Sequence, residues 1–232
     1  MVGEAPARDA PGTPVRDPLL VALALAAGVV DAISVSVLGV FTAAVTANVV
    51  FVGIALGDGD LHSAVRAALA IAGFVVGVLL ASRILRGREG RARPLGRVPL
   101  VLAGIATAQV AFLAGWIATD GRPEGAALDL LAVASAIAMG GQTAVAVSWR
   151  PDVSTTYVTG TLTVLIGELV ASTGTREDRV RQLSVIVAVA AGATAGSLLI
   201  AHERSLAAAL PLAITLVVTA GAAVARRARA SA

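Results

Sequence analysis

The stretch VTANVVFVGIALGDGD, from Val45 to Asp60, decides the fold. It is apolar, it carries Thr46 and Asn48 near its start, and it directly follows an apolar run that is long enough to cross a membrane alone. A helix needs about 20 apolar residues to span the hydrocarbon core of a bilayer. A second, shorter apolar piece behind a complete span therefore predicts a broken helix, or a segment that enters the membrane and leaves on the same side.

The same arrangement recurs in the second half of the chain, where VTGTLTVLIGEL begins at Val158. The motif VTAN at Val45–Asn48 corresponds to VTGT at Val158–Thr161. We interpret the surrounding pieces, about Phe41–Gly57 and Ser154–Ser172, as two short re-entrant or broken segments. A short, tilted full span is the alternative for each. Threonine and asparagine side chains there would hydrogen-bond the backbone groups that a helix break frees in lipid.

The composition places the chain in a membrane. Of 232 residues, 57% are hydrophobic and 14% are charged, and the mean hydropathy is +0.86. The apolar runs are continuous and do not alternate, which favours an all-α, polytopic helical membrane protein over a β-barrel. Cysteine is absent, which excludes disulfides, thiol catalysis and cysteine-bound metal. All basic side chains are arginines beside apolar runs, so they predict membrane orientation and not nucleic-acid binding.

Six apolar runs are about as long as a transmembrane helix. They cover about Leu19–Val40, Leu61–Ala81, Val98–Ala118, Ala126–Val147, Leu183–Ala201 and Leu206–Ala225. Residues 1–18 are rich in proline, glycine and mixed charge, which predicts a disordered tail. The membrane part divides into a first repeat over residues 19–118 and a second over residues 126–225, followed by a basic tail over residues 226–232. Each repeat has one span, one short threonine-bearing segment and two more spans.

Arginines predict which side of the membrane each connection faces. Six lie between the second and third spans, from Arg83 to Arg97, and three lie at the C-terminus, from Arg226 to Arg229. Cytoplasmic loops carry the excess of positive charge, so both regions and the N-terminus should be cytoplasmic in a multi-pass protein of the bacterial inner membrane. All of these regions can be cytoplasmic only if the two short segments do not cross the membrane. Three spans in each half then give an inverted 3+3 repeat, as in many secondary transporters.

Several motifs resemble a known family. The run GVVDAISVSVLGVFTAAVTANVV, from Gly28 to Val50, resembles the first signature of the YoaK-type family of uncharacterised bacterial membrane proteins. The later runs AMGGQTAVA and PDVSTTYVTGTLTVL resemble its second signature, and the resemblance covers most of the chain after the tail. The sequence departs from the family pattern at Ala47, where glycine is usual, and at Thr143, where an amide is common. The resemblance implies the membrane architecture and no particular activity.

Asp31 is the strongest single candidate for a working residue. It lies near the middle of the first span, with long apolar stretches on both sides. A charged carboxylate at that depth costs roughly 2.5–3.5 kcal/mol on insertion scales, and such residues usually face a cavity or a proton relay. Protonation would relieve this cost, so we expect Asp31 to couple proton movement to transport. The alternative is a neutral aspartic acid that only hydrogen-bonds a neighbouring helix.

The other candidates for a substrate or ion pathway are polar or small residues at the breaks and in the fourth span. They are Thr46, Asn48, Thr159, Gly160 and Thr161 at the two breaks, Gln142 and Thr143 in the fourth span, and Glu168 behind the second break. Gly160 would permit unusual backbone angles, and Gln142 would be the rough repeat counterpart of Asp31. Each also has a plain structural interpretation, because such residues commonly pack helices in membranes. Glu168 would then simply lie near the interface.

Some polar and aromatic residues predict boundaries and not chemistry. Arg66 and Asp129 lie close to span ends, where polar side chains reach toward water, and Trp116 and Trp149 should anchor the interfaces. The stretch GDGDLH, at residues 57–62, contains the Gly-x-Gly-Asp pattern of intramembrane aspartyl proteases. Its partner motif is absent, and aspartate and glycine suit a turn. We therefore predict no catalytic residue, no metal site and no cofactor.

We predict a transporter or channel-like permease for a small solute, an anion being one candidate, with proton coupling through Asp31. The two broken segments would meet near the midplane, where half-helix N-termini attract anions. An intramembrane enzyme that acts on a lipid or lipophilic substrate is a second hypothesis, and a non-catalytic membrane scaffold is a third. The expected partners are the lipid bilayer, the solute and protons, without nucleic acid. A homo-oligomer is compatible with the sequence.

Overall fold

The computed structural model describes residues 16–86, 94–149 and 158–230. The predicted tail up to residue 15, the tip of the arginine-rich connection and the start of the second short segment lie outside the described residues. Within them, every regular element is a helix. The elements are α1 (Arg16–Ile33), η1 (Ser34–Leu38), α2 (Val45–Gly57), α3 (Leu61–Arg86), α4 (Pro94–Ala118), α5 (Gly125–Trp149), α6 (Val158–Val170), α7 (Arg176–His202), η2 (Arg204–Leu206) and α8 (Ala209–Ala230).

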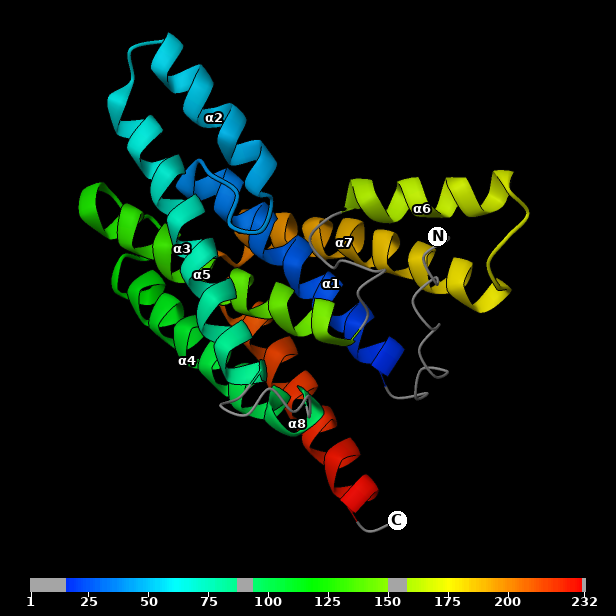
Figure 1. The fold of residues 1–232 in the computed structure, drawn as a ribbon. Coiled ribbons are helices and arrows are strands. Elements are labelled where there is room, and N and C mark those ends of the chain that lie inside the picture. Colours follow the sequence, from blue (N-terminus) through cyan, green and yellow to red (C-terminus); the bar gives the residue numbers. More distant parts are fainter. Residues whose placement is uncertain (1–15, 87–93, 150–157, 231–232) are drawn as a thin grey trace.

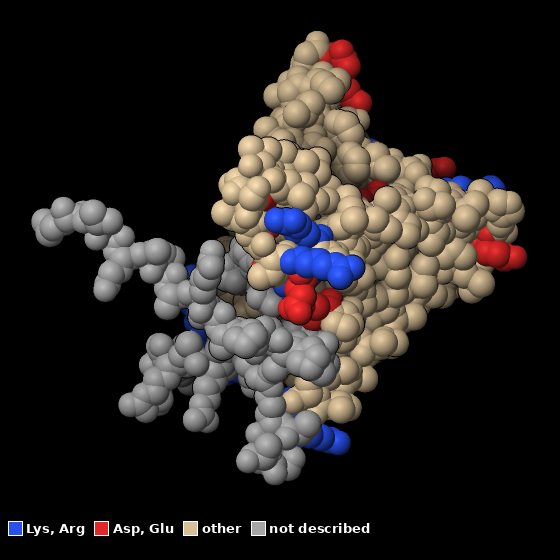
Figure 2. Space-filling model, turned by 90° about the vertical axis from the view of Figure 1, so that its right-hand side faces the viewer, with Lys and Arg blue, Asp and Glu red and all other residues tan. Residues whose placement is uncertain are grey.

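Six of the described helical stretches are long and apolar enough to cross a membrane, which confirms the predicted polytopic all-α membrane protein. They are Asp17–Leu38, Leu61–Arg86, Arg97–Ala118, Gly125–Trp149, Arg176–His202 and Arg204–Arg227. The helices α2 and α6 are the two short apolar elements, each of 13 residues. Large apolar side chains lie on the outside, Leu130 and Val217 being 69% exposed, as lipid contact requires. In Figure 2, charged side chains gather at the margins and in one cluster, and most of the visible face carries no charge.

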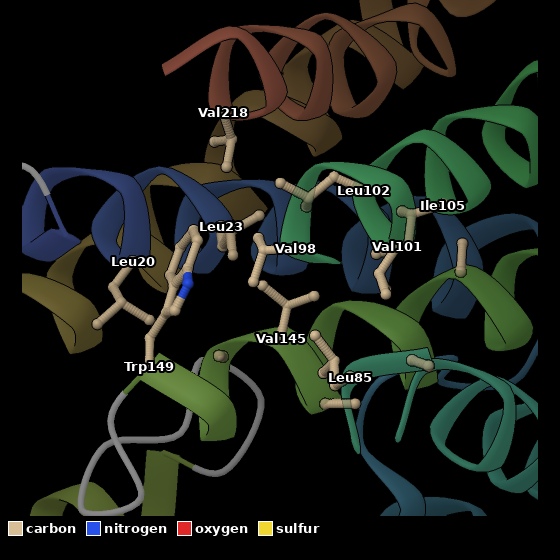
Figure 3. Packing of buried hydrophobic residues seen from close by; sticks show 14 residues of the cluster. Leu20, Leu23, Leu85, Val98, Val101, Leu102, Ile105, Val145, Trp149 and Val218 are labelled. Atoms are coloured by element: carbon tan, nitrogen blue, oxygen red, sulfur yellow. The ribbon is translucent and has the colours of Figure 1, made fainter. Parts of the chain in front are cut away.

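Two long helix pairs form the centre of the bundle. Helix α1 runs along α7, and α3 runs along α5. Helix α4 packs on α5 and α8, α8 also packs on α1, and each short helix packs on the helix that follows it, α2 on α3 and α6 on α7 (Figure 1). Leucine and valine side chains from α1, α4, α5 and α8 interlock where these helices meet (Figure 3). The two halves of the chain are therefore interlocked and not separate domains.

Glycines bring the backbones of α1 and α7 into contact. A Cβ atom placed at Gly28 of α1 would lie 2.0 Å from the carbonyl oxygen of Val189 in α7. One placed at Gly192 of α7 would lie 2.1 Å from the carbonyl oxygen of Leu25 in α1. A side chain does not fit at either position without separating the helices. Small residues at such crossings are the usual means by which helices pack tightly in a membrane.

The pair of α3 and α5 repeats the same glycine contacts. A Cβ atom at Gly140 of α5 would lie 2.1 Å from the carbonyl oxygen of Phe74 in α3. One at Gly77 of α3 would lie 2.1 Å from the carbonyl oxygen of Ile137 in α5. In this second pair, α5 corresponds to α1 and α3 corresponds to α7. Each principal pair therefore joins one helix from the first half of the chain to one helix from the second half.

An ion pair lies between the helices of each principal pair. Nε of Arg66 in α3 lies 2.8 Å from Oδ1 of Asp129 in α5. Nη1 of Arg181 in α7 lies 3.7 Å from Oδ2 of Asp17 in α1, and Arg181 is 4% exposed. Arg66 and Asp129 therefore do not simply reach toward water, as their positions near span ends had predicted. They bind each other across the interface.

The third helix of each half begins with the same kind of cap. At α3, both the backbone and the side chain of Ser63 donate to the carboxylate of Asp60. At α7, the backbone N–H of Asp178 donates to Thr175 Oγ1, and the Thr175 hydroxyl donates back to Asp178. Such caps satisfy N–H groups that have no partner within the helix. The residue before each cap is a glycine with positive φ: Gly59 at 74° and Gly174 at 77°.

The tryptophans pack inside the bundle, in contrast to the predicted interfacial anchors. Trp116 is fully buried, and its Nε1 donates to the carbonyl oxygen of Arg204 at 2.9 Å, which ties the end of α4 to the connection between α7 and α8. Trp149 is 6% exposed and belongs to the same apolar cluster as Leu20 and Leu23 of α1 (Figure 3).

Candidate functional site

The first candidate site is the break between α1 and α2. The α-helix of α1 ends at Ile33, a π-helical turn follows over Ser34–Leu38, and Gly39 then adopts a φ of 71°. Helix α2 begins only at Val45. π-Helical turns and single left-handed glycines recur at functional sites because they break the regular hydrogen-bond ladder and redirect the chain. The backbone between Gly39 and α2 therefore needs hydrogen-bond partners from elsewhere.

Asp31 supplies two of these hydrogen bonds. Its Oδ1 atom accepts the backbone N–H of Thr42 at 3.2 Å and that of Ala43 at 2.9 Å. The carboxylate thus reaches from α1 to the linker that leads into α2. Two converging N–H donors offset part of the cost of placing a carboxylate in an apolar bundle. Asp31 consequently holds the broken segment in place.

Asn48 holds the same linker from the other side. Its Oδ1 accepts the backbone N–H of Phe41 at 2.9 Å, and its Nδ2 donates to the carbonyl oxygen of Phe41. The amide side chain satisfies both backbone groups of one residue, which in lipid would otherwise be costly. Asn48 is 2% exposed, so water does not reach this clamp freely.

Three hydroxyl groups connect the break to α5. The Ser34 and Thr42 hydroxyls lie 3.1 Å apart, and the hydroxyl of Ser135 in α5 donates to Thr42 Oγ1 at 3.1 Å. All three residues are buried. No pattern in the sequence singles these residues out, because isolated serines and threonines in apolar helices usually bond only to their own backbone. Their roles follow from the fold, which brings the break against α5.

Gln142 lies outside this network. It is fully buried in α5, and its Nε2 donates to the carbonyl oxygen of Leu23 in α1 at 2.9 Å. Its Oε1 has no hydrogen-bond partner among the described residues. The register of the glycine contacts matches Gly28 to Gly140, so the counterpart of Asp31 is Thr143 and not Gln142. Thr143 donates to the carbonyl oxygen of Met139, one turn earlier in its own helix.

Helix α6 carries the second threonine motif. Thr161 is 2% exposed, as is Asn48 at the matching place in α2. Thr46 and Thr159 are both exposed on their short helices. Gly160 lies in the first turn of α6 in a helical conformation, so the unusual backbone angle expected there is not adopted.

Glu168 belongs to a different part of the molecule. Its Oε2 accepts a hydrogen bond from Nε2 of Gln182 in α7 at 3.3 Å, near the C-terminal end of α6. Figure 1 shows α2 and α6 lying apart, with the N-terminal ends of both helices turned toward the middle of the molecule. The structure thus brings Asp31 and Asn48 together at one break, and it leaves Glu168 at the far end of the other short helix.

The hydrogen bonds around Asp31 define what the site can do. Its partners among the described residues are backbone N–H groups, and no acid, base or nucleophile there is hydrogen-bonded to its carboxylate. The carboxylate is thus an ionisable group that holds a helix break through backbone N–H groups.

The fold and the site together define a polytopic all-α membrane protein, whose described part has six helical stretches long enough to span a membrane, two short apolar helices and a carboxylate at a helix break. The chain belongs to the family described as "Protein of unknown function (DUF1275)", whose model matches residues 19–221. It is similar to "UPF0700 transmembrane protein YoaK" of Bacillus subtilis (strain 168), with 32% identity over 156 residues, which cover 66% of this chain and 67% of the relative. These matches confirm the resemblance drawn from the sequence motifs. No solved structure matches the chain.

Proposed function

We propose that the protein is a transporter or channel-like permease for a small solute, and that its halves work as an inverted repeat in the bacterial inner membrane. The observation that carries the proposal is Asp31, which holds a broken helix inside an apolar bundle through the N–H groups of Thr42 and Ala43. Titratable residues at that depth commonly belong to ion or proton pathways. The matched glycine contacts of the two principal helix pairs support the repeat.

Proton coupling would act through these two hydrogen bonds. An ionised carboxylate accepts hydrogen bonds that are roughly twice as strong as those of a neutral acceptor. Protonation of Asp31 would weaken its grip on the linker, and the start of α2 would be freer to move. The proton would thus change the position of the broken segment, which is the element expected to gate the pathway.

The same geometry bears on the solute. The N–H groups of Thr42 and Ala43, in the linker just before α2, are bound by the protein's own carboxylate, which also places negative charge close to the N-terminus of α2. An anionic solute would have to displace Asp31 or bind elsewhere. We therefore favour a neutral or cationic solute at the first break over the anion that half-helix N-termini alone would suggest.

Uptake by proteoliposomes tests this function. Liposomes with the protein, and matched liposomes without it, are exposed to a bacterial small-molecule extract with and without an imposed pH gradient, and the accumulated solutes are identified by mass spectrometry. We expect at least one solute to accumulate only with the protein, and Asp31→Asn to remove its dependence on the pH gradient. Asp58→Asn, at an exposed carboxylate, is the control and should behave as wild type. Identical uptake with and without the protein would overturn the proposal.

Orientation has its own test, because the chain contains no cysteine. We propose that both termini and the connection after α3 are cytoplasmic. A single cysteine introduced by Ser82→Cys should resist a membrane-impermeant maleimide added outside cells, whereas one introduced by Asp58→Cys should react. The reverse labelling pattern would invert the topology.

A further inference from the structure

An apolar groove opens on the outside of the bundle between α3 and α4. It measures about 160 Å³, and the side chains of α5 form its floor. Helices α3 and α4 both pack on α5 but contact each other far less, so a gap remains between them. Its lining is apolar and includes Leu80, Ile84, Val101, Gly104, Ile105 and Ala108.

A positive charge stands at one end of this groove. Arg97 lies one helical turn before Val101, on the same face of α4 that lines the groove, because residues four apart share a helix face. Its Nη1 donates to the carbonyl oxygen of Ile84, which lines the groove from α3, at 3.2 Å. Arg83 and Arg86 lie in the last turn of α3, and all three arginine residues are exposed.

We propose that this groove binds one acyl chain of an anionic phospholipid, with the lipid's phosphate against Arg97. The groove lies within the span and opens to the outside of the bundle, where acyl chains are the surrounding solvent. Basic sites between transmembrane helices recognise anionic head groups, and the guanidinium at the mouth matches that charge. The chain enters alongside Val101 and Gly104 and reaches toward Ala108. The site stands independently of the transported solute.

A substitution at Gly104 can fill the groove without disturbing the fold. A Cβ atom at Gly104 meets nothing within 4 Å, and neither does one at Gly53 on α2. Gly104→Leu therefore places a side chain in space that the acyl chain would use, and Gly53→Leu is a matched control away from the groove. Gly104→Ala fills less of the same space, and it replaces the leucine variant in the experiment if that variant does not fold.

Native mass spectrometry of the full chain in mild detergent, with dioleoyl phosphatidylglycerol or dioleoyl phosphatidylcholine added, tests the site. We expect wild type to bind phosphatidylglycerol about fivefold more tightly, the preference of roughly one arginine for an anionic lipid. Arg97→Gln should abolish the preference while retaining some binding of both lipids. Gly104→Leu should reduce binding of both lipids, Gly104→Ala should reduce it less, and Gly53→Leu should match wild type.

Three results would overturn the proposal. Equal binding of the two lipids by wild type would remove the charge recognition. Unchanged binding in both Gly104 variants would show that the acyl chain lies elsewhere. Binding of glycerol phosphate alone, as tightly as the whole lipid, would mean a soluble anion site with no role for the groove.

Discussion

The short helices α2 and α6 share a similar setting but differ in the polar side chains near their N-terminal ends. Both short helices have 13 residues, begin with Val-Thr and pack on a third helix that starts with a side-chain cap. At the first break, however, Asp31 and Asn48 hold the linker through four hydrogen bonds. At the matching places in the second half stand Thr143 and Thr161, which carry neither a carboxylate nor an amide. Among the described residues, the two short helices thus share length, motif and helix packing, whereas the carboxylate and amide contacts are found at α2.

The largest expected effect comes from the glycines at which the paired helices touch, because the α1–α7 pair and the α3–α5 pair both need them for close packing. Gly77→Ala and Gly192→Ala each place a Cβ atom 2.1 Å from a backbone carbonyl oxygen of the facing helix. Each should lower the free energy of unfolding by about 3 kcal/mol, the upper range for overpacking. Thermal unfolding in detergent measures the loss, and Gly53→Ala, at an open position inside α2, should not lower the midpoint. A tolerated substitution at one crossing only would show that the halves are not equivalent.

Asn48→Thr makes the first break resemble the second. Threonine has a shorter side chain with a single polar atom, so it does not reach both the N–H and the carbonyl oxygen of Phe41 as the two ends of the amide do. We expect a loss of about 2 kcal/mol, because buried backbone groups lose their partners. Hydrogen–deuterium exchange should accelerate between Gly39 and Ala44. Thr46→Val, at an exposed position on the same helix, is the control and should leave exchange in that linker unchanged.

The two inter-helix ion pairs allow a finer comparison. Arg66→Gln should cost about 1 kcal/mol, because Arg66 and Asp129 are partly exposed at 18% and 27%. Arg181→Gln should cost about 2 kcal/mol, because Arg181 is 4% exposed and binds both Asp17 and Asp178. Salt should weaken the Arg66 pair more than the Arg181 pair. Equal losses with equal salt dependence would contradict this ranking.

The smallest expected effect concerns the cap of α3. The hydrogen bond from the Ser63 side chain holds the pKa of Asp60 below its usual value of 3.8. A lowered folded-state pKa adds stability above the unfolded-state pKa, and this is lost as pH falls through the folded-state value. Below about pH 4, wild type should therefore lose its small advantage over Asp60→Asn in thermal unfolding. An advantage that persists undiminished at pH 3 would exclude this role for the carboxylate.

Apolar run length was enough to predict the architecture. The six spans and the two short helices follow from it, because only a helix satisfies its own backbone in lipid. Asp31 and Asn48 were identifiable because polar residues in an apolar run are costly. The contact of Ser34 and Thr42 with Ser135 could not be predicted from the sequence, because it depends on how the break turns toward α5.

An internal alignment would have predicted more of the packing. Asp17 precedes Gly28 by the same interval as Asp129 precedes Gly140, and these residues make matching contacts. The position of Asp129 near a span end does not by itself predict its partner Arg66. Each principal pair joins a helix from the first half of the chain to a helix from the second half, and hydropathy alone does not predict which helices pair.

The location of the Asp31 contacts has a consequence for biosynthesis. The main packing partner of α1 is α7, which the ribosome makes only after most of the chain has emerged. Until then, α1 must reside in the bilayer or the insertion machinery without it. The Asp31 carboxylate can be hydrogen-bonded before α7 is synthesised, because the N–H groups that bind it belong to Thr42 and Ala43, which are translated soon after it. The first helix and its linker can therefore leave the translocon with this carboxylate already hydrogen-bonded, and the late-arriving α7 then adds its glycine contacts and the ion pair between Arg181 and Asp17.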